Sequence, residues 1–130
     1  MKKWSILLTR YLLGIIFLFN SVNFIFQFAP LLTPDKSDLA QRFLLLLEEA
    51  GYFYPIISGV TFLTALALLT NRYLPFLLII KFPLTLNGVL FHIRMDPAMT
   101  PVAVTVALMH FYLIYVNRDK YLPMLVNGNQ

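Results

Sequence analysis

Cysteine is absent from this sequence, and charged residues are scarce. The 130 residues include no cysteine, which excludes disulfides, thiolate metal sites and a catalytic thiol. Only 12% of the residues are charged, whereas about 25% is usual in soluble domains. Because a small domain needs polar side chains to cover its large surface, this shortage argues against a soluble protein.

The few acidic residues are informative by their placement. All six carboxylates lie in connections or in the C-terminal tail, outside the long apolar stretches. A carboxylate proton relay across a membrane, paired-carboxylate catalysis and a Glu-x-x-His di-metal site are therefore not expected. The sequence has no glycine-rich phosphate loop, nucleophile elbow or metalloprotease signature, and no basic tail that would bind nucleic acid.

Four long apolar stretches account for most of the chain. Hydrophobic residues make up 59% of it, and a bilayer core about 30 Å thick needs roughly 20 apolar residues per helix. Backbone polar groups in lipid must be satisfied internally, and the stretches show no period-two alternation, so they predict helices. We expect one all-α domain over 1–130, an integral membrane four-helix bundle with spans at about 4–28, 55–70, 74–92 and 101–116.

The first connection, 30–54, predicts a loop followed by a short surface helix. Two prolines near its start favour the loop, and Asp38 and Gly51 are suitable N-cap and C-cap residues for the helix. Phe28 stands where a signal peptidase would need a small residue, so we expect the first span to remain uncleaved.

The basic residues near the span ends predict the orientation of the bundle. One side would carry Lys2, Lys3, Arg72, Arg118 and Lys120, and the other would carry Lys36, Arg42 and Arg94. By the positive-inside rule, this difference predicts that both termini lie in the cytoplasm.

The polar residues inside the spans fall on stripes at helical spacing. Lys81, Thr85, Gly88 and His92 share one face of the third span. On the first span, one stripe holds Arg10, Gly14 and Ser21, and a second holds Asn20, Asn23 and Gln27. We predict that these sides of the first and third spans face each other. The candidate binding pocket consists of Lys81, Asn87, His92, Arg10, Asn20 and Asn23.

Each polar residue also has a purely structural interpretation. Arg10 and Lys81 could extend to the lipid headgroups, and the amides could form interhelical hydrogen bonds. His92 and His110 differ in depth by on the order of 10 Å, which disfavours a haem held between them. We expect a buried polar contact for His110, a kink at Pro83 and no metal site.

Distinctive motifs occur along nearly the whole chain. They are Ala50 to Pro55, Leu68 to Pro75, Pro83 through Asn87 to His92 with Asp96-Pro97, Arg10 with Leu13-Gly14, and the basic aromatic end at 115–121. Together these motifs resemble the DoxX-like family of small four-span bacterial membrane proteins. The resemblance implies a protein of the bacterial inner membrane that is associated with redox complexes.

Two departures from that family pattern concern buried charge. Family members commonly have a lysine late in the first span and a glutamate in the second, where this sequence has Phe24 and Thr61. Lys81, in contrast, occupies a position where the family usually has an apolar or small residue. A polar centre on Lys81, Asn87 and His92 would then be specific to this chain.

Three functions are compatible with the sequence, which contains no complete catalytic constellation. The first is an accessory or anchoring subunit of a membrane redox system, with a quinone as ligand of the polar pocket. Its partners would be the bilayer, redox-complex subunits or a second copy. The second is a non-catalytic scaffold whose partner recognises 31–54. Transport of a small solute is the weakest, because no internal repeat and no buried carboxylate support it.

Overall fold

The computed structural model describes residues 2–29 and 36–126, and these are helical with short connections. The predicted all-α fold is confirmed, with no strand in either described range. The elements in chain order are α1 (Lys2–Phe26), α2 (Asp38–Ala50), α3 (Phe53–Thr70), α4 (Leu74–Met95), η1 (Pro97–Met99), α5 (Thr100–Val116), α6 (Arg118–Tyr121) and η2 (Leu122–Leu125).

Four helical stretches in the described chain are long and apolar enough to cross a bilayer. They are Lys2–Phe26, Phe53–Thr70, Leu74–Met95 and Pro97–Val116, close to the four predicted spans. The first span ends earlier than the predicted 28, because Gln27 has a left-handed backbone and the Asn23 side chain accepts a hydrogen bond from the Ala29 amide at 2.8 Å. A side-chain cap therefore stops the helix before the apolar run ends.

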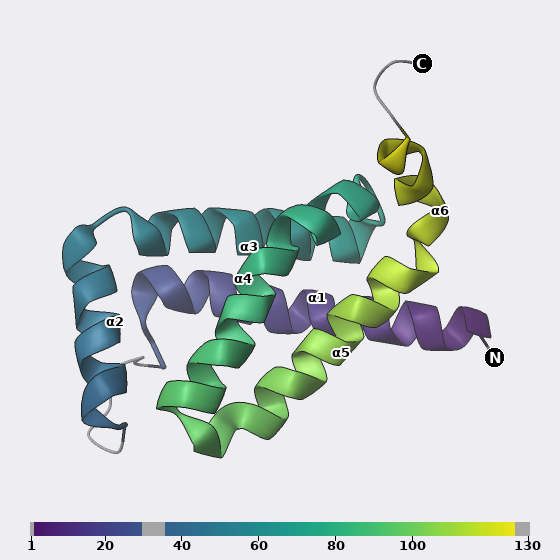
Figure 1. Cartoon of the computed structure of the whole chain (residues 1–130). Helices are drawn as coiled ribbons and strands as arrows, with labels where there is room; N and C mark the ends of the chain where they lie inside the picture. Colours follow the sequence, from purple (N-terminus) through teal and green to yellow (C-terminus); the bar gives the residue numbers. More distant parts are fainter. Residues whose placement is uncertain (1, 30–35, 127–130) are drawn as a thin grey trace.

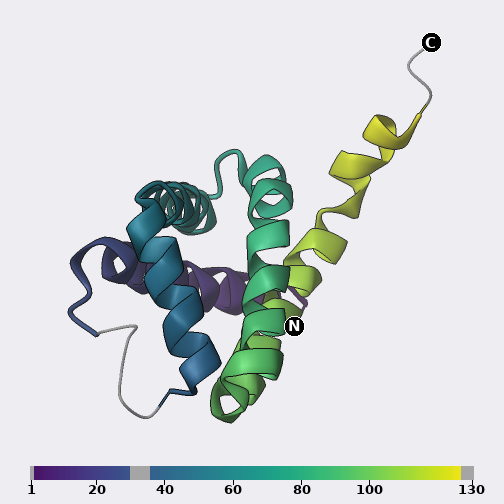
Figure 2. The ribbon, with the colours of Figure 1, turned by 60° about the vertical axis from the view of Figure 1, so that its left-hand side comes forward.

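The helices form two pairs that cross each other. α1 and α3 lie side by side, and α4 and α5 form a hairpin across them (Figures 1 and 2). α2 lies across the end of the α1–α3 pair that is far from the start of α1 (Figure 1). The core between the pairs consists of Leu13, Phe17, Ala65, Ala67, Leu68, Leu74, Leu78 and Leu113.

Close contact between α1 and α3 depends on small residues. A Cβ atom added at Gly14 would lie 2.9 Å from Leu69 Cδ2 and 3.2 Å from Leu68 Cβ. About two turns further along α1, Ser58 Oγ donates a hydrogen bond to the Ser21 carbonyl at 2.7 Å. The stripe that holds Gly14 and Ser21 therefore packs against the second span, and the prediction that it faces the third span is wrong. Its small side chains let the two backbones approach closely.

The surface helix α2 is confirmed, with one correction at its start. Ser37, and not Asp38, is the N-cap residue, because Ser37 Oγ accepts a hydrogen bond from the Ala40 amide at 3.1 Å. Gly51 is the C-cap, as predicted, with a positive φ of 83° that favours glycine. The loop that we expected before this helix falls mostly on residues 30–35, outside the described residues.

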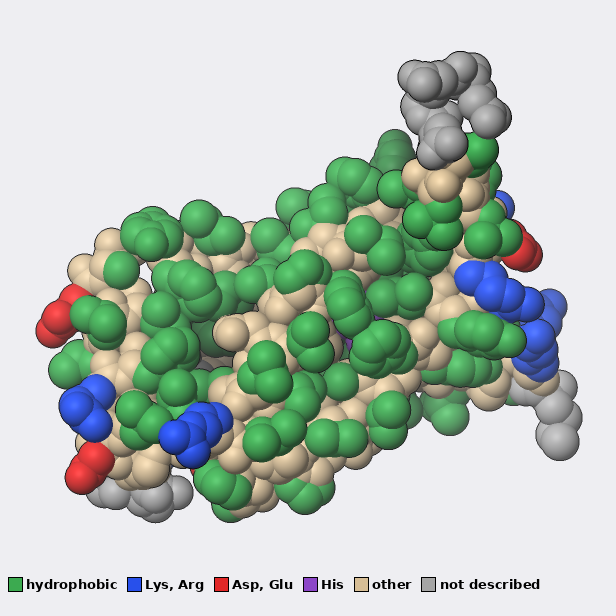
Figure 3. Space-filling model, in the orientation of Figure 1, with side chains coloured by type: hydrophobic (Ala, Val, Ile, Leu, Met, Phe, Trp, Pro, Cys, Tyr) green, Lys and Arg blue, Asp and Glu red, His purple; other side chains and the backbone are tan. Residues whose placement is uncertain are grey.

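The surface has the distribution of polarity that a bilayer requires. Figure 3 shows hydrophobic side chains over the middle of the molecule and charged side chains gathered at its two ends. Large apolar residues such as Ile15, Phe62 and Leu108 are well exposed on the spans. Soluble monomers rarely expose so continuous an apolar surface. The chain is therefore a membrane-embedded protein.

One end of the bundle holds the start of α1, the α3–α4 turn and α6 (Figure 1). The five basic residues that we assigned to one side belong to these segments. The Tyr121 hydroxyl donates a hydrogen bond to the Pro75 carbonyl at 2.7 Å and so ties α6 to the start of α4. Burial raises the pKa of Tyr121 to about 12, so this phenol keeps its proton at neutral pH.

Candidate functional site

A cavity of about 370 Å³ lies between the two helix pairs and beneath α2. Its volume falls in the range of sites for small molecules and cofactors. All four spans and α2 contribute to its walls, which are mainly aliphatic and aromatic. The hollow between α2 and α4 is visible in the face shown in Figure 3. The polar residues that line the cavity are Asn20, Lys36, Tyr54, Lys81, Thr85, Asn87 and His92.

The predicted polar stripe of the third span faces this cavity. Lys81, Thr85, Gly88 and His92 all line it from α4, as their helical spacing requires. α1 faces them from the opposite wall with Phe17 and Asn20 among others. The first and third spans thus meet across a cavity, whereas their backbones pack mainly on other helices, α1 on α3 and α4 on α5.

Lys81 is the most unusual residue of the cavity. Its side chain is only 7% exposed, and its Nζ lies 5.0 Å from the centroid of the Phe17 ring. No carboxylate and no hydrogen-bond acceptor among residues 2–29 and 36–126 pairs with it. Burying an unpaired ammonium costs several kcal/mol, and a cation–π contact offsets on the order of 1–2 kcal/mol of that cost. The headgroup contact considered for Lys81 is wrong, because its ammonium points into the bundle.

His110 holds the floor of the cavity in place. Its ring is fully buried, Nε2 lies 2.8 Å from the Leu78 carbonyl, and Nδ1 lies 2.9 Å from Thr85 Oγ1. Because a carbonyl can only accept, Nε2 carries a proton, and in the neutral ring Nδ1 accepts from the Thr85 hydroxyl. The predicted buried polar contact is confirmed. Both ring nitrogens are engaged, so neither is available for a haem.

Pro83 lies inside α4, two residues after Lys81. Proline has no N–H, so the helix lacks the bond that residue 83 would make to the Ile79 carbonyl. Lys81 makes no hydrogen bond to this carbonyl in the described structure. The polar side chain that reaches this part of α4 is His110, and it uses the neighbouring carbonyl of Leu78.

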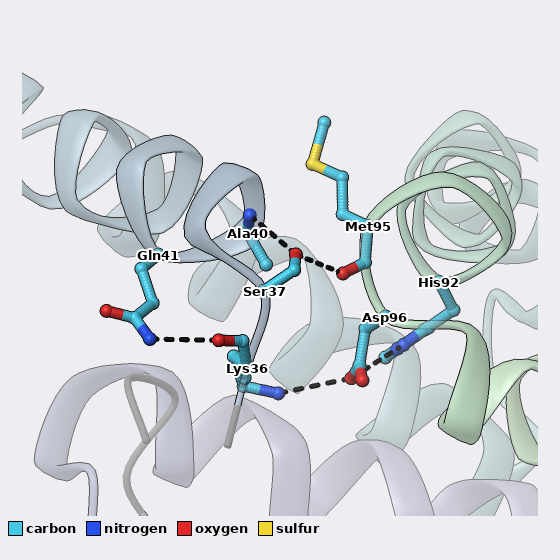
Figure 4. Close-up of polar contacts among 7 residues, drawn as sticks. All are labelled: Lys36, Ser37, Ala40, Gln41, His92, Met95 and Asp96. Carbon is cyan, nitrogen blue, oxygen red and sulfur yellow. Dashed lines mark hydrogen bonds and ion pairs between the residues drawn. The ribbon is translucent and has the colours of Figure 1, made fainter. Parts of the chain in front are cut away.

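A group of polar contacts closes the cavity beside α2 (Figure 4). Lys36 Nζ lies 3.1 Å from Asp96 Oδ2, and His92 Nδ1 lies 3.4 Å from the same oxygen. No hydrogen bond forms across the second distance, and His92 Nδ1 is buried without a hydrogen-bond partner. Ser37 Oγ also donates to the Met95 carbonyl at 2.7 Å. The start of α2 is thus fastened to the end of α4.

This polar group was missed in the sequence. Lys36 and Asp96 are 60 residues apart, and only the four-span topology places both segments at the same end of the bundle. The sequence signal was present, because the end of the third span and the connection after the first span must lie on one side of the membrane. That signal predicts that the two residues lie on the same side of the membrane, but it does not predict that they form an ion pair.

The six residues of the predicted pocket do not all meet. Lys81, Asn87, His92 and Asn20 line the cavity, and the side-chain amides of the two asparagines make no hydrogen bond to another described residue. Asn23 instead caps the end of α1. Arg10 Nε donates to the Leu68 carbonyl at 2.8 Å, near the C-terminus of α3.

The positions of Asn23 and Arg10 have simple physical reasons. A helix end leaves carbonyls and amides without partners, and side chains of these types satisfy them. Asn23 accepts from the amide of Ala29, which follows the end of its own helix, and Arg10 donates to a carbonyl in the last turn of α3, where a cation also complements the helix dipole. Neither residue lines the cavity, so fewer of the predicted residues contribute to the pocket than the sequence indicated.

Of the two positions where the DoxX-like pattern has a buried pair, one lines the cavity and the other is buried elsewhere in the bundle. Phe24 lines the cavity and stacks at 5.9 Å on Tyr54, whose hydroxyl donates to the Leu44 carbonyl at 3.0 Å. Thr61 is buried, and its hydroxyl has no partner in the described structure. Aromatic packing and a small polar side chain therefore occupy these two positions.

The arrangement is suited to binding. The buried Lys81 ammonium and the exposed Asn20 and Asn87 amides line one mainly apolar cavity, and they can orient a molecule that has an oxygen-bearing head and an apolar body. Comparisons with protein-family models, with curated proteins and with solved structures gave no match to this chain. The resemblance to the DoxX-like family therefore rests on the sequence motifs alone.

Proposed function

We propose that this chain is an accessory or anchoring subunit of a membrane redox system and that its cavity contacts the quinone pool. The observation that carries the proposal is the unpaired Lys81 ammonium inside an apolar cavity of about 370 Å³. A quinone has a flat apolar ring, which can pack beside Phe17, and carbonyl oxygens that accept hydrogen bonds from Lys81. The Asn20 and Asn87 amides supply further donors along the same walls.

The redox association itself comes from the DoxX-like resemblance, and the cavity is compatible with it. On this proposal the chain supplies no catalytic group of its own. It would hold the quinone head near a partner subunit that carries the redox centre. The same resemblance is the reason to propose the bacterial inner membrane as its location, where such partners and the quinone pool are found.

Both termini are proposed to lie in the cytoplasm. The start of α1 and the end of α5 are at the same end of the bundle, together with Lys2, Lys3, Arg72, Arg118 and Lys120 (Figure 1). Reporter fusions at either terminus should give the cytoplasmic signal, and a fusion after Arg94 should give the opposite one. Signals on opposite sides for the two termini would contradict the topology.

The quinone site can be tested by thermal stabilisation. A short-chain quinone analogue should raise the melting temperature of the detergent-purified protein, since a ligand that binds only the folded state stabilises it. Lys81→Met should abolish this rise, because it removes the donor and keeps a similar volume. Lys120→Met, at an exposed position outside the cavity, should leave it unchanged. A rise that persists in Lys81→Met would place the ligand elsewhere, and no rise in the intact protein would rule out the proposal.

A further inference from the structure

We infer that the cavity binds lipophilic anions, so that the negatively charged head of an apolar molecule is the natural partner of Lys81. The inference rests on the proposed function only in that both use the same cavity. It adds the charge of the ligand head, which the proposed function leaves open. Three observations support it: the charges around the cavity, the state of the polar atoms near Lys81, and the shape of the apolar walls.

The cavity contains a positive charge without a counter-charge, that of Lys81. Two lysines and a histidine line the cavity, and no aspartate or glutamate of the described chain does. The carboxylate closest to this set is Asp96, and it is shared by Lys36 and His92 at the edge of the cavity. Lys81 is left without a counter-charge, because the other described carboxylates belong to α2 and α6 and do not pair with it.

The polar atoms of α4 near Lys81 are already engaged. One helical turn on, the Thr85 hydroxyl is bonded to His110 Nδ1, and one turn back, the Leu78 carbonyl is bonded to His110 Nε2. An ammonium has three donors, and no described hydrogen bond uses one of those on Lys81. A neutral carbonyl could accept one of these protons, but only an anion also supplies the missing charge in a low-dielectric cavity.

The walls define the rest of the ligand. The Asn20 and Asn87 amides add two neutral donors, and aromatic and aliphatic side chains such as Phe43 and Leu47 of α2 surround the remaining space. An oxyanion attached to a flat ring or an alkyl chain fits this arrangement. Two sources share that chemistry, namely the enolate of a hydroxyquinone and the carboxylate of a fatty acid.

A matched pair of ligands tests the charge directly. A hydroxynaphthoquinone with a long alkyl chain is a vinylogous acid and is therefore an enolate at neutral pH, whereas its methyl ether has the same ring and chain without charge. We expect the purified wild-type protein to bind the enolate at least about tenfold more tightly than the ether, measured by calorimetry in detergent micelles. Equal or tighter binding of the ether would overturn the inference.

Substitutions at Lys81 assign the preference to its ammonium. Lys81→Gln should reduce the ratio of the two affinities to near one, and Lys81→Arg should retain a preference for the enolate. Lys120→Met is the control and should behave as the wild type. A preference that survives in Lys81→Gln would overturn the inference, and the wild-type comparison stands even if a variant fails to fold.

Dodecanoate and dodecanol form the second arm, which separates the two sources. Binding of dodecanoate but not dodecanol, with no binding of any quinone, would support the anion site and contradict the quinone proposal. Equal binding of the charged and uncharged quinones would support the quinone proposal and contradict the anion site. If neither pair binds, both proposals fail.

Discussion

Replacing His110 with alanine is expected to lower the free energy of unfolding by about 3 kcal/mol. The His110 ring on α5 is fully buried, and its two nitrogens contact the Thr85 hydroxyl and the Leu78 carbonyl, both on α4. Its removal leaves a void between α4 and α5 and deprives two polar groups of their partner. Most of the loss comes from the void, since hydrogen bonds between membrane helices contribute only about 0.6 kcal/mol on average. Reversible unfolding in mixed detergent, followed by circular dichroism, measures it.

A control variant and a double variant separate the two parts of this loss. Thr105→Val removes an exposed hydroxyl that bonds only to its own helix, at the Pro101 carbonyl, and should change stability by less than about 0.5 kcal/mol. Thr85→Val combined with His110→Leu fills the space and removes both members of the bond, so its cost should be less than the sum of the single variants. A His110→Ala protein as stable as the wild type would contradict the assigned bridge.

Replacing Gly14 with leucine should destabilise the bundle by about 2 kcal/mol. A Cβ at this position already comes within 3.2 Å of Leu68 Cβ, which lies close to the α3 backbone and cannot move away easily. The larger side chain would therefore force α1 and α3 apart. Because these two helices make the most extensive contact in the structure, their separation should also loosen the wall of the cavity. The same unfolding assay gives the expected loss.

Gly59 provides a matched position for the control. It lies on α3 and is exposed, and a Cβ added there meets no atom within 4 Å. Gly59→Leu should leave stability within about 0.5 kcal/mol of the wild type, because the new side chain points towards lipid. If both glycine variants lose the same stability, the close approach of α1 to α3 would not explain the effect, since leucine favours a helix more than glycine does.

The sequence predicted the roles of the polar residues better for the third span than for the first. On α4 the polar residues are spaced by four and then seven residues, which is one or two helical turns, so one face had to turn inward. The structure shows Lys81, Thr85 and His92 on the cavity. On α1 the polar residues have several different uses that spacing alone does not distinguish. Arg10 bonds to a neighbouring helix end, and Asn23 caps its own. These uses depend on backbone ends whose positions follow from packing.

The sequence by itself determined that this chain is embedded in a bilayer, how many spans it has and where its charged residues lie relative to them. The reason is that the free-energy cost of exposing polar backbone and charge to lipid acts locally along the chain. The tertiary structure decided which helices are neighbours and what surrounds Lys81. The pairing of α1 with α3, the fastening of α2 by Asp96 and the His110 bridge each join residues far apart in the chain. Such contacts arise from the shapes of whole helix faces, which no local pattern specifies.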